Sequence, residues 1–294
     1  PDYPYLGTYL WAFFWGNSYL ELEYFGRYFY VYFYLISLFL ILEICNIKNN
    51  YLKISLILFL ILLSFEPYYF AGYQEYLIFS TLIIASKYIY IHQQDNKKNI
   101  KLMLMIFLIL YLNSWFKNEG EVYFLIFSIP LIYLASLKNN KKLLLILFII
   151  ILMIIKYAVD KYFIKDFTSQ GTEHLFYFLQ NLGDIKYLVI KTSKILLNIL
   201  IVFIKHPLWI VAFLSIFVQS FIFKKISLIS NYFVISLVLN LLTIFAVYVT
   251  MGNIDFMLKV TLDRVLFQTS GFYIVLFLSI LNFPKLNLNN KIIF

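Results

Sequence analysis

Acidic and basic side chains occupy very short polar breaks between long apolar segments, and their residue types could support charge-based chemistry. Glu75 follows Tyr73 in one such break, and Glu119 follows Lys117 in another. Ionisable groups near a membrane are costly and are usually functional or paired. We therefore name Glu75 and Glu119 as candidate catalytic carboxylates. The structural alternative is an ion pair of Lys117 with Glu119 or Glu121 at a helix turn.

Arginine is rare in this chain, which uses lysine for almost all of its positive charge. Arg27 and Arg264 are the only arginines among 24 lysines and arginines. A guanidinium binds phosphate or carboxylate through two parallel hydrogen bonds, which an ammonium cannot do. Arg264 begins a late apolar segment, at the depth where a lipid phosphate would lie. A structural ion pair with Asp263 is the alternative.

Other catalytic or binding motifs are absent from the sequence. The histidines, His92, His174 and His206, are far apart and show no metal-ligand spacing, so we expect them to be structural or solvated. The single cysteine, Cys45, excludes an internal disulfide. No glycine-rich phosphate loop or nucleophile elbow is present.

The composition predicts a polytopic membrane protein. Of its 294 residues 63% are hydrophobic, against ~45–50% in soluble domains. A spanning segment must be helical, because an open sheet cannot satisfy its backbone in lipid. We expect an all-α transmembrane helical bundle of about nine or ten membrane segments, forming one integral domain over 1–294. Within it we expect an outer loop with an interfacial helix (1–24), a first helical module (25–159), an outer loop with an interfacial or re-entrant helix (160–206) and a C-terminal helical module (207–294).

The net charge of +9 is an orientation signal, because the lysines lie mostly in short loops. With 1–24 outside, the loops around Lys48, Lys98 and Lys141 all face inside. The second half depends on the segment 187–204. If it spans fully, Arg264 lies inside; if it is interfacial or re-enters, Arg264 lies outside, and we favour the second arrangement.

The carboxylates are distributed unevenly on this topology. Only Glu43 and Asp95 of the 15 lie near the inner face. Carboxylates contribute little to orientation, so an active site on the outer face is one explanation. The other is that long outer loops need solvation.

The first stretch of the chain resembles the first outer loop of GT-C membrane glycosyltransferases, such as protein O-mannosyltransferases, aminoarabinose transferases and the RgtA-D-like family. Asp2-Tyr3-Pro4-Tyr5-Leu6-Gly7 loosely matches that family's His-Pro-Pro-Leu-Gly-like turn, with Tyr3 in place of the histidine. Glu23-Tyr24-Phe25-Gly26-Arg27 matches its acid-x-x-x-Arg approach to a membrane helix. The chain starts with Pro1 rather than Met, and we expect it to be truncated at the N-terminus.

The resemblance implies an enzyme of the bacterial inner membrane, a hexosyl- or pentosyltransferase with its active site facing the periplasm. The donor would be a polyprenyl-phosphate sugar, and the acceptor a lipid-linked, glycan or protein molecule, with no role for nucleic acid. A divalent metal ion, Mg²⁺ or Mn²⁺, is compatible with the family. The main acidic residue would lie upstream of Pro1. Arg264 and Lys117 would bind the donor phosphate, and the substrate-binding residues would be Asp2, Tyr3, Glu23, Arg27 and Tyr73.

Two other classes fit a membrane protein of this kind. A transporter or flippase of a lipid-linked or anionic solute often has helices that are broken near mid-membrane, whereas the polar residues here gather at one face. An O-antigen polymerase or ligase also has a long outer loop, but such enzymes depend on arginines in outer loops. The loop from Asp160 to Lys186 has none.

The alternating basic loops predict that Lys98 and Lys141 face the cytoplasm and Glu119 the periplasm. We expect single cysteines at these positions, in a chain with Cys45 replaced, to differ in their reaction with an impermeant thiol reagent that is added to intact spheroplasts. Position 119 should react and positions 98 and 141 should not. Labelling of position 98 in intact spheroplasts contradicts the topology.

Overall fold

The computed structural model describes residues 6, 9–10, 12–13, 25–45, 47–67, 74–94, 99–163, 184–222, 228–251 and 254–281, and every regular element among them is helical. Five helices are long and apolar enough to cross a membrane: Tyr28–Cys45, Asn139–Tyr162, Ile185–Lys205, Asn231–Thr250 and Ile254–Leu281. Three shorter apolar helices accompany them. The expectation of an all-α, multi-pass membrane bundle is confirmed; the described residues give eight such helices, long and short together, and the number of nine or ten membrane segments stays a prediction.

The first module packs around one buried helix. Its elements are α2 (Phe25–Leu42), η1 (Glu43–Cys45), α3 (Asn50–Ser64), α4 (Glu75–Gln94), α5 (Ile100–Phe116), α6 (Glu119–Leu134) and α7 (Asn139–Phe163). Asparagine side chains start two of them: Asn49 accepts from the backbone N–H of Tyr51, and Asn99 accepts from that of Leu102. Helix α4 is buried on almost every side, as expected of a central helix.

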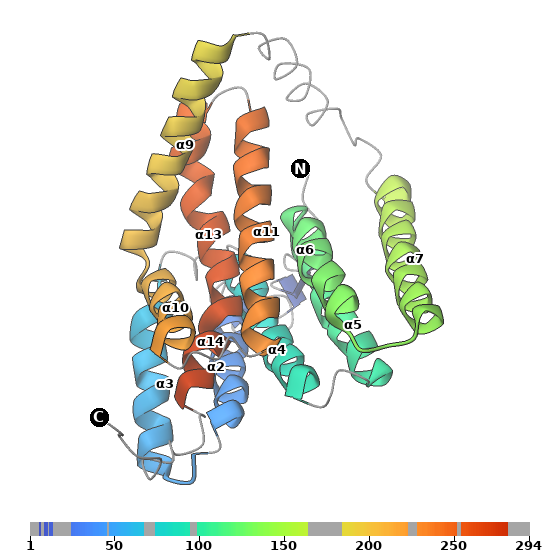
Figure 1. Ribbon diagram of the computed structural model, residues 1–294, viewed down its shortest axis with the longest axis vertical. Helices are drawn as coiled ribbons and strands as arrows, with labels where there is room; N and C mark the ends of the chain where they lie inside the picture. The colour runs from blue at the N-terminus through green and yellow to red at the C-terminus, as the bar shows by residue number, and fades with distance from the viewer. Residues whose placement is uncertain are drawn as a thin grey trace, which may run out of the picture.

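The second module consists of two long helical rods and one further helix. The first rod is α9 (Ile185–Lys205) followed by α10 (Pro207–Phe217) and the π-helical η3 (Val218–Ile222). Helix α11 (Leu228–Thr250) returns, and the second rod then runs through α12 (Ile254–Met257), the π-helical η4 (Leu258–Leu262), α13 (Asp263–Ser270), η5 (Gly271–Tyr273) and α14 (Ile274–Leu281). Figure 1 shows both rods descending on the same side of the molecule.

The two rods run parallel along their whole length. Lys194 of α9 pairs with Asp255 at 3.0 Å, and His206, at the α9–α10 break, is 2.8 Å from Asp263. Below the break, the indole of Trp209 donates to the Leu266 carbonyl. Each contact joins residues about sixty positions apart, so α9 and α10 follow the second rod in the same direction.

This arrangement differs from the expected interfacial or re-entrant helix over 187–204. Helix α9 continues into α10 with only a break before Pro207, so the two form a single descent. The physical reason is the contact surface: α9 packs along α11 and η4 instead of lying apart from the bundle. Arg264 lies at the same end of the bundle as Glu75 and Lys117, and that this end faces outwards stays a prediction. We call this end the outer end.

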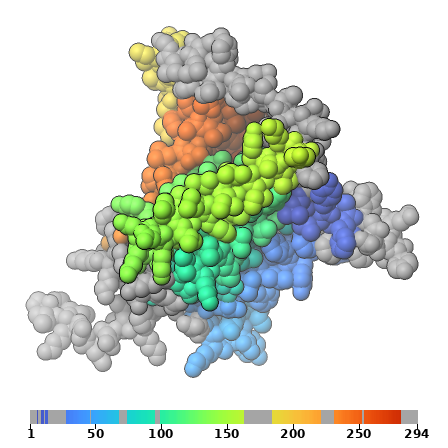
Figure 2. Space-filling view, turned by 90° about the vertical axis from the view of Figure 1, so that its right-hand side faces the viewer, coloured from blue at the N-terminus to red at the C-terminus, as the bar shows by residue number. Residues whose placement is uncertain are grey.

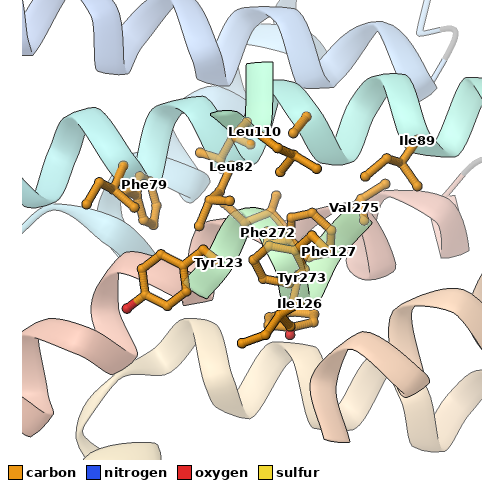
Figure 3. Close-up of a cluster of buried hydrophobic side chains, with 14 of the residues drawn as sticks. Phe79, Leu82, Ile89, Leu110, Tyr123, Ile126, Phe127, Phe272, Tyr273 and Val275 are labelled. Carbon is orange, nitrogen blue, oxygen red and sulfur yellow. The ribbon is translucent and has the colours of Figure 1, made fainter. Parts of the chain in front are cut away.

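Aromatic rings fill the core where the second rod crosses the first module (Figure 3). Phe79 of α4 stacks on Phe267 of α13, with ring centroids 4.9 Å apart and planes 6° apart. Phe127 of α6 stacks on Phe272 of η5 at 3.9 Å. These rings bury large apolar areas and hold α4, α6 and α13 in one register.

Gly271 allows α4 and the second rod to approach closely. A Cβ at this position would lie 2.8 Å from the Phe79 ring and 2.9 Å from the Phe79 carbonyl oxygen. The residue precedes the ring contact of Phe272 and lies two turns below Arg264. The missing side chain therefore helps to bring Arg264 next to the start of α4.

Helix α7 lies on the outside of the first module. It crosses α5 and α6, as Figure 2 shows, and most of its apolar side chains are exposed. On the buried side, Lys156 is only 1% exposed and pairs with Glu121 and Asp160. A lipid environment accounts for the exposed apolar face.

Gly271→Ala should destabilise the bundle by about 1–3 kcal/mol, because the added methyl group meets a ring and a backbone carbonyl that cannot both move. Thermal unfolding of the purified protein in mild detergent measures this. Leu242→Ala is the control, since Leu242 is 57% exposed on α11. Equal midpoints for the two variants would show that the close approach at Gly271 has no energetic consequence.

Candidate functional site

A buried ion cluster joins three helix ends at the outer end of the bundle. The Glu75 carboxylate is fully buried, and its Oε1 accepts from Lys117 Nζ at 2.7 Å and from Arg264 Nε at 2.6 Å. Arg264 Nη2 also contacts this oxygen. The cluster carries two positive charges and one negative charge. Arg264 is its most accessible member, with 24% of its side chain exposed.

Helix ends place these charges favourably. Glu75 is the first residue of α4, where the helix dipole favours an anion, and Lys117 follows the last residue of α5, where it favours a cation. Arg264 is the second residue of α13, directly after the π-helical η4. π-helical turns are frequent at functional sites.

The tight turn between α5 and α6 fixes Lys117. Gly120 lies so close to α5 that a Cβ would be 1.9 Å from the Asn113 carbonyl oxygen. The Lys117 backbone N–H donates to that same oxygen at 3.2 Å. Any larger residue at 120 must therefore displace the backbone that carries Lys117.

A second set of charges adjoins the first through Asp263 and Arg264, which are consecutive. Nε2 of His206 is 2.8 Å from Asp263 Oδ1, and its Nδ1 is 3.7 Å from Glu66 Oε1. His206 is 7% exposed, whereas both carboxylates are more accessible. The outer charge cluster, as we call the whole set, consists of Glu66, Glu75, Lys117, His206, Asp263 and Arg264.

A cavity of about 230 Å³ lies beside the outer charge cluster, between α6, α11 and the segment from α12 to α13. Its polar lining comes from Glu119, Tyr123, Asn240, Thr243, Tyr248 and Thr261, and its apolar lining from Val122, Ile126, Ile244, Val247, Met251, Met257 and Val265. Tyr123 connects the cavity to the cluster: its hydroxyl donates to Gln268 Oε1 at 2.8 Å, and the charges of both Glu119 and Glu75 act on it.

The structure brings together three of the four residues named as catalytic or phosphate-binding candidates: Glu75, Lys117 and Arg264. Glu119 lies apart from their ion pairs and lines the cavity instead. The alternative of ion pairs within the turn around Lys117 is replaced by ion pairs with residues that are distant in the sequence. Lys117 pairs with Glu75 rather than within its own turn, and Glu121 is 3.4 Å from Lys156.

Arg264 and Asp263, which the alternative interpretation paired with each other, each contact a residue that is distant in the sequence. Arg264 reaches Glu75, which is 189 residues away in the chain, and Asp263 reaches His206. His206, which was expected to be structural or solvated, is buried, and the parallel rods bring it between two carboxylates.

The residues of the family-like turn lie outside the described part of the chain. These are Asp2, Tyr3 and Glu23, and the same holds for Tyr73. Arg27 is the third residue of α2, and its side chain is also outside the description. Their proposed role in substrate binding stays a prediction.

Among the described residues, no group of three or more His, Cys, Asp or Glu side chains is arranged to hold a metal ion. Glu66, His206 and Asp263 come nearest in residue type, but their atoms are arranged as ion pairs. The use of Mg²⁺ or Mn²⁺ stays a prediction of the family resemblance.

Sequence reasoning did not identify the residues that link the cluster to the cavity. Tyr123 lies four residues after Glu119, and Gln268 lies four residues after Arg264, so each shares a helix face with a named candidate. This spacing was the available signal. Thr261 and Tyr248, whose hydroxyls are 2.6 Å apart, had no such signal because their contact depends on tertiary packing.

Comparisons with known proteins do not assign this chain to a family. No protein-family model, curated protein or solved structure matches this chain. The interpretation of the site rests on the residues and on their geometry.

Glu75→Gln should destabilise the protein by on the order of 3–5 kcal/mol, because Lys117 would keep a buried charge without its carboxylate. Replacing Lys117 with Met in the same chain should recover part of this loss. Thermal unfolding in detergent of the two single variants and the double variant measures the coupling.

Asp255→Asn provides the matched control. Asp255 and Lys194 form an ion pair whose side chains are 65% and 47% exposed, so its loss should cost less than about 1 kcal/mol. Additive effects of Glu75→Gln and Lys117→Met would show that the buried pair is not energetically coupled.

Proposed function

We propose that this protein is a membrane glycosyltransferase that transfers a sugar from a polyprenyl-phosphate donor to a periplasmic or lipid-linked acceptor. The observation that carries the proposal is the buried Glu75 carboxylate, held between Lys117 and Arg264 beside a cavity that reaches the lipid. It places cationic groups, a carboxylate and an apolar chamber together at one end of the bundle.

The depth of Arg264 suits a lipid phosphate. Seventeen residues separate Arg264 from Leu281 at the inner end of α14, which is about 26 Å at a rise of ~1.5 Å per residue. The hydrocarbon core of a bilayer is ~30 Å thick. The apolar span begins ten residues earlier, at Ile254, so a lipid phosphate would have to lie part-way down this rod, where the guanidinium can hold it in a fixed orientation.

The cost of the cluster supports a functional role. A buried ion pair seldom stabilises a protein more than apolar residues of the same volume, and charges in membrane segments are usually found at substrate pathways. Glu75, Lys117 and Arg264 together have a net charge of +1, so an anionic ligand would balance this group, although Glu66 and Asp263 bring the whole outer charge cluster to −1 when His206 is neutral. This is the behaviour expected of a phosphate site.

The reaction would be nucleophilic substitution at the anomeric carbon of the donor sugar. The acceptor oxygen forms a bond to that carbon while the bond from carbon to the phosphate oxygen breaks, and polyprenyl phosphate leaves. The acceptor proton passes to a carboxylate, for which Glu119 is the described candidate beside the cavity. Arg264 and Lys117 stabilise the charge on the leaving phosphate, and Glu75 positions both cations.

A transporter or flippase of a lipid-linked anion is the second candidate. The observation that favours it is the break between α9 and α10 at Pro207 together with two π-helical segments, because interrupted helices are common in transporters. The ionisable cluster lies part-way along both rods, beside the α9–α10 break and at the start of α13, which is also compatible with a transporter site near mid-membrane. Movement of a fluorescent polyprenyl-phosphate lipid across proteoliposomes, without sugar transfer, would favour this candidate.

Arg264→Lys should keep the charge and the fold but lower sugar transfer by about 1–3 kcal/mol of transition-state stabilisation, roughly 5- to 150-fold in rate. An ammonium cannot bind both Glu75 and a phosphate in the fixed geometry of the guanidinium. Transfer from a polyprenyl-phosphate sugar in proteoliposomes is the measurement.

Lys259→Gln is the control for charge alone, because Lys259 is exposed on η4, five residues before Arg264. It should transfer at the rate of the unchanged protein. Full activity of Arg264→Lys would remove Arg264 from the phosphate site.

A further inference from the structure

The cavity beside Glu119 opens sideways into the membrane. Val122 on α6 and Val247 on α11 both line it and are 37% and 41% exposed. The neighbouring exposed residues of these helices are apolar, so this surface faces lipid. The opening between α6 and α11 therefore admits molecules from the bilayer rather than from water.

The interior of the cavity suits an aliphatic chain. Ile126 and Ile244 line its length, with Met257 and Val265 nearer the outer end. The α11 positions run from Asn240 to Met251, a distance of about 16 Å along the helix. Such an elongated apolar slot matches the outer part of a lipid chain.

Polar groups at two levels of the cavity await a hydrogen-bonding ligand. Oε2 of Glu119 is buried and has no hydrogen-bond partner among the described residues. The fully buried Asn240 also lines the cavity, and the Tyr273 hydroxyl is its neighbour. Buried polar atoms without partners are rare in folded proteins, and here they face a chamber that a ligand can enter.

The charge of the cavity differs from that of the group formed by Glu75, Lys117 and Arg264. Among the described residues that line the cavity, Glu119 is the only carboxylate, and none is a lysine or an arginine. A carboxylate in a medium of low dielectric repels a phosphate strongly, whereas it accepts a hydrogen bond from a hydroxyl. Lys117 and Arg264 contact Glu75 instead, and none of these three residues lines the cavity.

From this separation of charge we propose that the cavity binds a second membrane lipid with an uncharged, hydroxyl-bearing head group, which enters between α6 and α11 and donates its hydroxyl to Glu119. The inference rests on the proposed function for one point only: the bound lipid would be the sugar acceptor. Its hydroxyl would then lie beside Tyr123, between the carboxylate and the phosphate site. Binding itself does not depend on that role.

Photolabelling tests the site without any sugar transfer. The purified full-length chain in phosphatidylcholine vesicles is exposed to a long-chain alcohol that carries a diazirine, and the labelled peptides are identified by mass spectrometry. Peptides of α6 and α11 should be labelled. The same chain ended by a phosphate should label them about tenfold less, because Glu119 repels it.

Substitutions on α11 assign the label to the cavity. Ile244→Trp fills the chamber and should lower labelling about tenfold, while Leu242→Trp, on the lipid-facing side of the same helix, should leave it unchanged. Glu119→Gln should remove the preference for the alcohol over the phosphate-ended chain. Ile244→Ala widens the chamber and should label at least as well as the unchanged protein.

Equal labelling of Ile244→Trp and Leu242→Trp, or a preference for the phosphate-ended chain, overturns the proposal. If Ile244→Trp fails to fold, the loss of preference in Glu119→Gln decides alone. Labelling of the cavity in a protein that transfers no sugar would keep this inference and reject the proposed function. Sugar transfer by a protein whose cavity is not labelled would keep the proposed function and reject this inference.

Discussion

The Glu75 carboxylate is the constraint on which the outer end of the bundle depends. It is fully buried, so it must be matched by positive charge, and the cations come from α5 and α13. Three helices are therefore fixed relative to one another by one oxygen atom. The stacked rings of Phe79 and Phe267 one turn below give the same register through apolar contact. Electrostatics and packing agree on one arrangement, which is a property of well-specified folds.

Much of the fold could be predicted from the sequence because hydropathy reports directly on helices in lipid. The long segments around α2, α7 and α11 illustrate this. The arrangement of α9 could not be predicted, because its sequence is equally compatible with a span, an interfacial helix or a re-entrant one. What decides is contact along η4 and α11, including the pair of Lys194 with Asp255. Such contacts join residues about sixty positions apart and leave no local signal.

The same division holds for the site. The types and positions of Glu75, Lys117 and Arg264 made them candidates, since short polar breaks and a rare arginine are visible in the sequence. Their mutual contact was not visible, because it depends on how α4 and α13 pack at Gly271. The partners of His206 were not visible for the same reason: a histidine before a proline gives no indication of two carboxylates brought to it by other elements.

The π-helical turn η4 has a further consequence for how the chain tolerates change. Such a turn holds one residue more than an α-helical turn of equal rise, and it absorbs that residue as a local widening. Insertions or deletions of single codons above Leu258 can be accommodated there without rotating α13. The direction in which Arg264 points is therefore unaffected by changes in the length of the rod before Leu258. The sequence at the start of the second rod can then change in length while the position of Arg264 stays the same.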